Sequence, residues 1–141
     1  MIVLTKAQAD LILSHARAQL PEEACGILAG HRENDVSVVS QVYLCENTDH
    51  SAEHFTISPK EQLSCLLDSR KQNLELIGNW HSHPETPSRM SEEDKRIAVN
   101  RSWSYLILSL QDTAHPVLNA FRYSEEQQSF EQEPLQIQEE R

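Results

Sequence analysis

The sequence of 141 residues is poor in the residues that mark a nucleic-acid-binding protein. Only 12 lysines and arginines stand against 22 aspartates and glutamates, so the net charge is −10. Aromatic residues are few, and the basic residues form no cluster. Because positive charge holds a nucleic acid through its phosphates, this balance argues against nucleic acid as a partner and favours a neutral or basic protein.

Cysteine and long hydrophobic runs are also scarce. Cys25, Cys45 and Cys65 are an odd number without a Cys-x-x-Cys pair, which predicts neither a disulfide framework nor a thiolate zinc site. A reducing, cytoplasmic setting is the expectation. No apolar run approaches the ~20 residues of a membrane span, and no basic segment followed by an apolar run opens the chain. We therefore expect a soluble protein that is neither exported nor membrane-bound.

The patterns that are present predict one α/β domain, which at this length buries roughly 68% of its unfolded surface. Helices are expected to start at Thr5, with Gln8 completing a capping box, at Ser58-Pro59 and at Ser91. Pro134 places the last strand at a sheet edge. Strands are expected at 22–30 and 35–44, joined by a turn at 31–35, and at 55–57, 74–83, 104–110, 117–123 and 130–137. The elements predict a sandwich around a mixed, mostly antiparallel sheet flanked by about three helices, with a domain at 1–137 and an acidic tail at 138–141.

The strongest chemical signal lies between Gly78 and Asp94. The apolar run before it predicts a buried strand that delivers His81 and His83. Residues two apart on a strand point to the same face, with Cα atoms roughly 6.6 Å apart, whereas Trp80 faces the core on the other side. Asp94 stands three residues into the helix that Ser91 opens. Two nitrogens and one carboxylate with an open fourth position are typical of catalytic zinc.

Simpler explanations exist for each part of this signal. A single His-x-His sequence arises by chance, and Ser91 with Asp94 also fits a capping box that needs no metal. Both functions can coexist, because capping would orient the aspartate for a metal. Among the other histidines, His15 is expected to pack in the core and His31 to be exposed in a turn. His50 and His54 are either surface residues without a role or contacts for a substrate.

A short stretch upstream holds the fifth candidate residue. Glu22 and Glu23 precede a strand of small residues, and taken alone they are better explained as solvated linker charges. Gly26 and Gly30 in that strand indicate a close backbone approach of the kind found beside sites.

With Glu23-Ala24-Cys25-Gly26 and His81 to Asp94 considered together, nearly the whole chain resembles the JAMM (MPN-plus) metalloprotease family. The resemblance implies a cytidine-deaminase-like fold and one Zn²⁺ per chain held by His81, His83 and Asp94, with a water in the fourth position. It assigns the general base to Glu23 rather than Glu22, because Glu23 stands two residues before the cysteine. It also implies that Ser91 hydrogen-bonds the oxyanion.

Physical chemistry supports these assignments independently of the resemblance. Zinc lowers the pKa of a bound water toward ~7 and polarises a carbonyl, which supplies the nucleophile that amide hydrolysis needs. A carboxylate within reach of that water contributes general base and acid catalysis worth typically ~10² to 10⁴. A hydroxyl directed at the oxyanion adds ~3 kcal/mol.

The resemblance also bears on the substrate. The short 84–90 loop lacks the insertions of the eukaryotic deubiquitinating members, and Met90 replaces a frequent proline, which loosens the loop. The chain is similar to the compact bacterial branch that hydrolyses amides at the C-terminal Gly-Gly tail of ubiquitin-like (β-grasp) sulfur-carrier proteins, for example CysO-cysteine peptidases, which release cysteine. The expectation is a zinc-dependent metallopeptidase or isopeptidase, and its oligomeric state is not predicted.

The alternative from another functional class is a non-catalytic MPN-type scaffold, which usually lacks the ligands. Other His-x-His hydrolases fit less well. Metallo-β-lactamase relatives need Asp-His where Glu85-Thr86 stands, and barrel amidohydrolases need roughly 250 residues. Zinc deaminases need His-x-Glu with Pro-Cys-x-x-Cys, which is absent.

Overall fold

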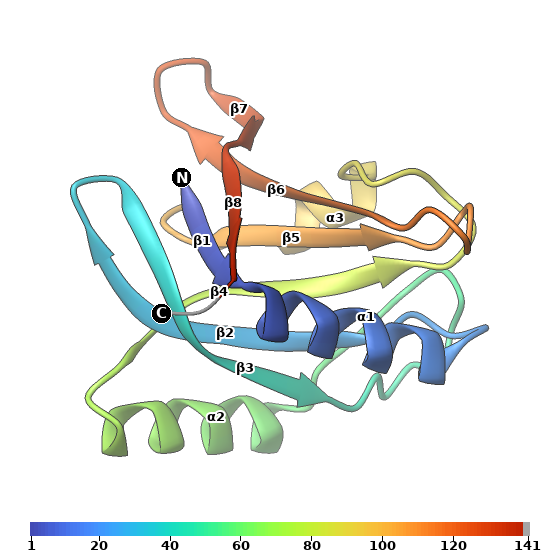
Figure 1. Ribbon diagram of the computed structural model, residues 1–141, viewed down its shortest axis with the longest axis horizontal. Helices are drawn as coiled ribbons and strands as arrows, with labels where there is room; N and C mark the ends of the chain where they lie inside the picture. Colours follow the sequence, from blue (N-terminus) through green and yellow to red (C-terminus); the bar gives the residue numbers. More distant parts are fainter. Residues whose placement is uncertain (140–141) are drawn as a thin grey trace.

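The computed structural model describes residues 1–139 and forms one α/β domain of three helices and eight strands over that range (Figure 1). In chain order the elements are β1 (Ile2–Thr5), α1 (Lys6–Gln19), β2 (Cys25–Glu33), β3 (Val36–Cys45), α2 (Pro59–Lys71), β4 (Glu75–His83), α3 (Glu92–Ile97), β5 (Ser104–Ser109), β6 (Val117–Ser124), β7 (Ser129–Glu133) and β8 (Leu135–Gln138). The predicted fold class, a mixed sheet with about three helices, is confirmed.

All eight strands belong to one mixed sheet in the order β7-β6-β5-β4-β2-β3-β1-β8. The pairs β2–β3, β2–β4, β5–β6 and β6–β7 are antiparallel, whereas β1–β3, β1–β8 and β4–β5 are parallel. The two edge strands are consecutive in sequence and separated only by Pro134, so the sheet curls until its edges approach each other. The Ile2 N–H donates to the Pro134 carbonyl at 2.9 Å.

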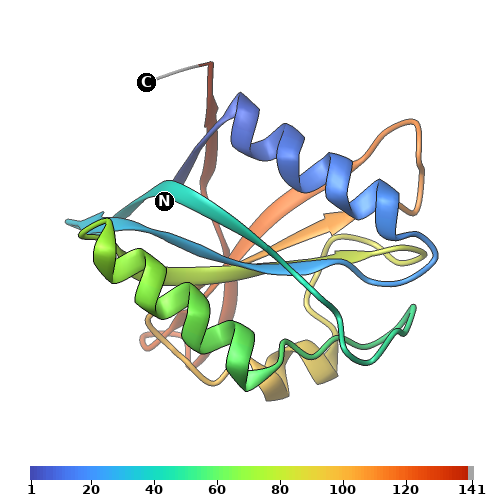
Figure 2. The ribbon, with the colours of Figure 1, turned by 90° about the horizontal axis from the view of Figure 1, so that it is seen from below.

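The helices cover the two faces of the sheet unequally. Figure 2 shows α1 on one face and α2 on the other, with α3 on the side of α2. Ile12 and Ala16 of α1 pack into the main core together with Trp80 and Leu106. On the opposite face two smaller apolar clusters form, one with Cys65 of α2 and one around Met90 and Ala98 beside α3. The start of β2 contributes Cys25 to the first of these clusters, β5 contributes Ile107 to the second, and β4 lies between these two strands.

The predicted helix starts are confirmed. The Thr5 hydroxyl accepts from the Gln8 N–H, and the Gln8 side chain accepts from the Thr5 N–H, which completes a capping box. Ser58 caps α2, with Pro59 at its first position. The half-buried ring of His15 meets the Trp80 ring edge-on at 6.0 Å, which confirms the core assignment of this histidine.

Gly26 allows the close approach that was expected of the glycines in this strand. A Cβ atom at Gly26 would lie 1.9 Å from the Tyr43 carbonyl oxygen and 2.2 Å from Nε1 of Trp80. The Trp80 indole N–H donates to that same carbonyl at 3.1 Å. Because a side chain would break this contact, the position requires glycine for the indole to sit against β2.

Several boundaries differ from the expectations. The expected strand at 55–57 is absent, because a buried asparagine side chain takes the Thr56 N–H that a strand partner would use. The β2–β3 turn contains only Asn34 and Asp35, both with positive φ, and His31 lies in β2 although it is exposed as expected. The third helix is short and ends at Ile97.

The chain termini add two further corrections. The sequence did not predict β1, a four-residue strand that pairs with distant segments. The expected strand at 130–137 is two strands, because Pro134 lacks an N–H and the chain passes there from one sheet edge to the other. Of the expected tail at 138–141, Gln138 belongs to β8, and residues 140–141 lie outside the described residues.

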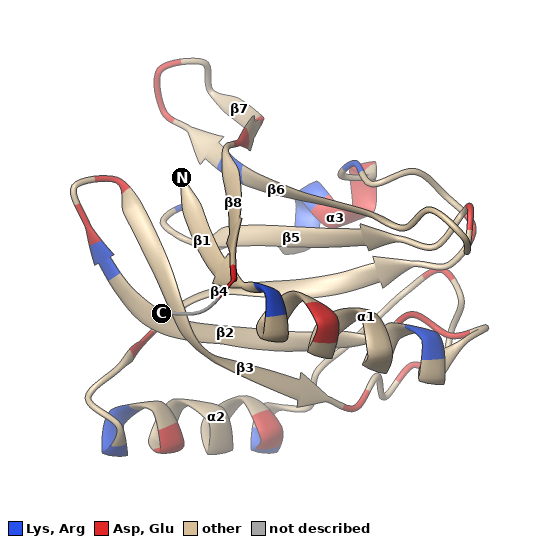
Figure 3. Ribbon diagram, in the orientation of Figure 1, with Lys and Arg blue, Asp and Glu red and all other residues tan. Residues whose placement is uncertain are grey.

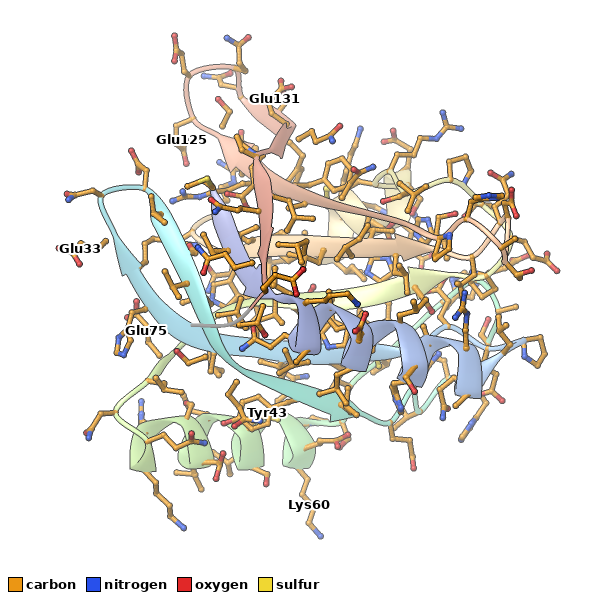
Figure 4. The ribbon with its side chains drawn as sticks, viewed as in Figure 1. Glu33, Tyr43, Lys60, Glu75, Glu125 and Glu131 are labelled. Carbon is orange, nitrogen blue, oxygen red and sulfur yellow. The ribbon has the colours of Figure 1, made fainter. Side chains whose placement is uncertain are left out.

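Charge is distributed so that both hairpin ends are acidic (Figure 3). Glu33 lies at the end of the β2–β3 hairpin, and Glu125 and Glu131 lie at the β6–β7 hairpin, all on the surface (Figure 4). These ends lie opposite the C-terminal ends of β4 and β5. Within residues 1–139, no helix is long and apolar enough to cross a membrane.

Candidate active site

The candidate site lies at the C-terminal end of β4, which delivers His81 and His83. The strand runs between antiparallel β2 and parallel β5, and His81 pairs in register with Cys25 and Ile107. Both histidines are buried, with 3% and 5% of their surfaces exposed. Their alternation with Trp80, which is fully buried on the other face, confirms the predicted orientation of that tryptophan.

Three potential ligand residues converge at one point. Nε2 of His81 and Nε2 of His83 are 3.1 Å apart; Oδ1 of Asp94 lies 3.3 Å from the former and Oδ2 of Asp94 lies 3.0 Å from the latter. A tetrahedral zinc ion with bonds of ~2.0–2.1 Å would separate its ligands by about 3.3 Å. Among the described residues, this trio is the group of histidine, cysteine and acidic side chains arranged to hold a metal ion. The donor set and its spacing therefore fit the expected zinc.

Neighbouring groups fix the direction of these ligands. Nδ1 of His83 lies 2.8 Å from the Pro87 carbonyl, to which it donates its N–H, and Nε2 is therefore the ring nitrogen that faces the site. Asp94 is held by the predicted capping box: its N–H donates to the Ser91 hydroxyl and its carboxylate accepts the Ser91 N–H, both at 3.0 Å. Phe55 stacks on His81 with ring centres 4.6 Å apart.

Burial and mutual contacts set the protonation of the three residues. Burial lowers the pKa of His81 and keeps its imidazole neutral. Burial would raise the pKa of Asp94, but contacts with His81 and His83 outweigh it and hold that pKa far below its usual range. For His83 burial acts downward, but the Asp94 carboxylate and the Pro87 carbonyl raise the pKa. The cluster thus combines an ionised carboxylate with imidazoles, which together attract a positive ion.

Glu23 lies beside this trio. It lies two residues before the start of β2, whose register with β4 pairs Cys25 with His81 and so brings Glu23 opposite His83. The side chain is 4% exposed, and its Oε1 has no hydrogen-bond partner. Burial raises the pKa of Glu23 to about 8, with Asp94 adding to the rise and His83 opposing it. A carboxyl group with a pKa near neutrality is suited to accept and return a proton.

Ser82 is a structural residue of the site that the sequence reasoning missed. This serine between the two histidines is fully buried. Its hydroxyl accepts from the Ala24 N–H at 2.8 Å, and its N–H donates to the Ala24 carbonyl at 3.0 Å. Both bonds hold the residue after Glu23 against β4. The only sequence signal was its position within His-Ser-His.

Ser91 lies at the rim of the site, and it is exposed. Its hydroxyl oxygen accepts from Asp94, and among the described residues no acceptor takes its proton. The 84–90 loop that leads to it is held by hydroxyl groups although residue 90 is methionine. Ser88 donates to the Ile107 carbonyl and Ser109 to the Thr86 carbonyl, both at 2.6 Å. Met90 itself is buried against the cluster beside α3.

A cavity of about 440 Å³ adjoins the trio. His81 and Asp94 are among its lining residues, together with Asn79, two residues before His81. The remaining lining is largely apolar and comes from the segments at 55–57 and 97–105. The cavity would receive an extended or apolar part of a ligand whose reacting bond lies at the trio.

The other polar candidates lie outside the trio. His50 pairs with Glu22 at 3.2 Å, so the two residues satisfy each other. His54 lies 2.8 Å from Glu93, which raises the pKa of this exposed histidine. The structure therefore brings together Glu23, His81, His83 and Asp94, with Ser91 at the edge, and leaves Glu22 with a surface partner.

The fold and this site define a JAB-type domain, and comparisons with known proteins agree. Residues 5–124 match the family model of prokaryotic homologs of the JAB domain, and the chain belongs to this family. The predicted resemblance to the JAMM (MPN-plus) family is thereby confirmed.

Named relatives and a solved structure extend the comparison. A Haloferax volcanii protein named desampylase is 34% identical over 107 residues, covering 71% of this chain and 74% of the relative. The CysO-cysteine peptidase of Mycobacterium tuberculosis is 27% identical over 118 residues, covering 82% and 80%. A Desulfitobacterium hafniense protein solved in solution has a TM-score of 0.90 at 46% identity, covering 99% of this chain and 94% of that one.

Proposed function

We propose that this protein is a zinc-dependent peptidase or isopeptidase that hydrolyses an amide at the C-terminal Gly-Gly tail of a small ubiquitin-like carrier. The observation that carries the proposal is the convergence of His81, His83 and Asp94 with a buried glutamate beside them. A structural zinc site has four protein ligands, whereas this set has three and adjoins a cavity.

The chain's own residues divide the work. Zinc, when bound by the trio at one ion per chain, supplies a nucleophilic water at neutral pH and polarises the scissile carbonyl. Glu23 accepts the proton of the attacking water and returns it to the leaving amine, for which a pKa of about 8 is suited. Ser91 donates a hydrogen bond from its hydroxyl group to the oxyanion. The burial of Glu23 and the histidines keeps bulk water from screening these charges.

The carrier tail is supported by two kinds of observation. The relatives are named desampylase and CysO-cysteine peptidase, which favours a small ubiquitin-like protein as the substrate. The site has no long insertion around it, since only the 84–90 loop separates β4 from α3, so a thin Gly-Gly tail can reach the trio. Release of a C-terminal cysteine is the specific reaction that we propose. The three cysteines are free and buried, which is compatible with a reducing cytoplasm.

The proposal is tested with purified protein loaded with zinc and several β-grasp carriers ending in Gly-Gly-Cys. Intact mass should show loss of the terminal residue from at least one carrier, and Glu23→Ala should abolish that loss while zinc stays bound. No loss from any carrier, with one zinc per chain measured, would overturn the substrate assignment.

The scaffold alternative makes opposite predictions. A non-catalytic domain should purify without stoichiometric zinc and should be indifferent to Glu23→Ala. The buried, unpartnered Oε1 of Glu23 argues against this alternative, because a scaffold gains nothing from a carboxyl group whose burial costs stability.

A further inference from the structure

The segment at 46–57, between β3 and α2, forms one wall of the site and contains a buried asparagine to which the mechanism assigns no task. Asn47 is 5% exposed, although the residues on both sides of it are exposed. Its side-chain amide is saturated with hydrogen bonds to the backbone. Such a side chain, uncharged, buried and hydrogen-bonded at every polar atom, fixes the backbone conformation of the loop around it.

The amide group of Asn47 binds the loop from both ends. Its Nδ2 donates to the His54 carbonyl at 2.9 Å, with a longer contact to the Ser51 carbonyl at 3.5 Å. Its Oδ1 accepts from the Asp49 N–H at 3.0 Å and from the Thr56 N–H at 3.2 Å. These bonds close the segment on itself, which explains why it is ordered without being a strand.

The same Nδ2 also donates to the backbone carbonyl of Glu23 at 3.0 Å. The N–H of Glu23 donates to the Ser51 carbonyl at 2.8 Å. Both backbone polar groups of Glu23 are therefore hydrogen-bonded to this loop. The loop that Asn47 holds also carries Phe55, whose ring stacks on His81.

We infer that Asn47 is a positioning residue that holds the general base Glu23 in line with the metal-binding trio; the inference rests on the proposed function. The carboxyl group of Glu23 has no partner at Oε1, so its own contacts do not fix it, and its location depends on the backbone beneath it. Because proton transfer requires the base within hydrogen-bond reach, a shift of about 1 Å costs up to ~10²-fold in rate.

The test is a double-mutant cycle with Asn47→Asp and Glu23→Gln. Aspartate has nearly the same shape and keeps both acceptor bonds, but it cannot donate to the carbonyls. We expect Asn47→Asp to lower kcat by about 10- to 100-fold with little change in KM. In the Glu23→Gln background the same substitution should change kcat by no more than about two-fold, because independent effects add and effects through one residue do not. Equal losses in both backgrounds would overturn the inference.

Two further variants separate positioning from general loosening and from the extra charge. Asn47→Ser removes the long amide without adding charge and should follow Asn47→Asp in the cycle; if the aspartate variant does not fold, the serine variant decides. Thr48→Val is the matched control. It removes one hydroxyl bond to the Thr56 carbonyl in the same loop, at 3.1 Å, but leaves the bonds to Glu23 intact. It should keep wild-type kcat.

A readout without activity keeps the inference testable if no carrier is cleaved. Backbone amide exchange of Glu23 reports its bond to the Ser51 carbonyl. Exchange should be at least about 10-fold faster in the Asn47 variants than in wild type and in Thr48→Val. Unchanged protection of Glu23 in both Asn47 variants would overturn the inference, whereas inactivity of wild type with zinc bound overturns only the proposed function.

Discussion

Trp80 and His81 are neighbours on β4 and are about equally inaccessible, with 0% and 3% of their surfaces exposed, but they face opposite sides of the sheet. On the Trp80 side, burial removes an apolar ring from water and stabilises the fold. On the His81 side, burial removes imidazoles and carboxylates from water, which costs free energy. One strand therefore carries a stabilising face and a costly one.

The unpartnered atoms make the same contrast. Nε1 of Trp80 has its hydrogen bond to Tyr43, whereas Nδ1 of His81 and Oε1 of Glu23 are buried without any. The burial of His81 and Glu23 is therefore explained by a role in the reaction and not by a contribution to packing. Substitutions on the two faces should consequently separate activity from stability.

The largest effect is expected from His83→Ala on the costly face. Removing one of three ligands should abolish zinc retention and lower activity by about 10⁴ or more, since the metal supplies the nucleophile. Metal analysis and turnover of a Gly-Gly-Cys carrier measure both. Thermal unfolding of metal-free protein should show no large loss of stability, and a variant that keeps stoichiometric zinc and full turnover would contradict the assignment.

The second-largest effect is expected from Glu23→Gln. Glutamine has the same shape but accepts no proton, so turnover should fall by about 10² to 10⁴ while zinc stays bound. Metal content and kcat measured on the same preparation distinguish this from ligand loss. If the zinc were lost as well, Glu23 would be part of the metal site instead of its base.

The pH dependence of stability sharpens the comparison further. In the metal-free protein the folded pKa of Glu23 is about 8 against 4.5 for the free side chain. Below pH 4.5 Glu23 is protonated in both the folded and the unfolded state, so its contribution to stability does not change with pH. Between pH 4.5 and about 8 the side chain is ionised in the unfolded state but still protonated in the folded state, so the free energy of unfolding falls as pH rises. In urea unfolding with chelator present, the free energy of unfolding of Glu23→Gln relative to that of wild type should rise by a few kcal/mol between pH 5 and pH 8. A constant difference would contradict the buried, protonated carboxyl.

Trp80→Phe tests the stabilising face and has the smallest expected effect. The smaller ring leaves a cavity and removes the indole hydrogen bond to the Tyr43 carbonyl, which should cost about 2 kcal/mol in unfolding free energy. Urea titration measures that loss. The zinc-loaded variant should keep near wild-type kcat, and a much larger effect on kcat than on stability would show that the two faces are coupled.

The trio and the helix caps were predictable because their signals are local. His81 and His83 are two residues apart on a strand, and Ser91 and Asp94 are one helical turn apart, so spacing alone determines their shared direction. The link to Glu23 came from the resemblance to a known family. Its distance from the trio in sequence, 58 residues to His81, hides the register of β2 with β4 that joins them.

The residues that sequence reasoning missed act through distant partners. Ser82 binds Ala24 and Asn47 binds Glu23, and neither contact leaves a periodic pattern. The segment at 55–57 has a strand-like composition, but the Asn47 side chain takes its N–H group. The four residues of β1 are too few to show alternation, and their partners lie far along the chain, at 37–38 in β3 and at 135–138 in β8.

The parallel pairing of β1 with β8 has a mechanical consequence. A force that pulls the start of β1 and the end of β8 apart would slide the two strands along each other, so all their cross-strand bonds share the load at once instead of opening one by one. Because β8 is connected to β7 through Pro134, part of that force would also act on β7 at the opposite edge of the sheet. A motor that pulls on both of these strand ends would therefore have to shear β1 from β8 in one cooperative step.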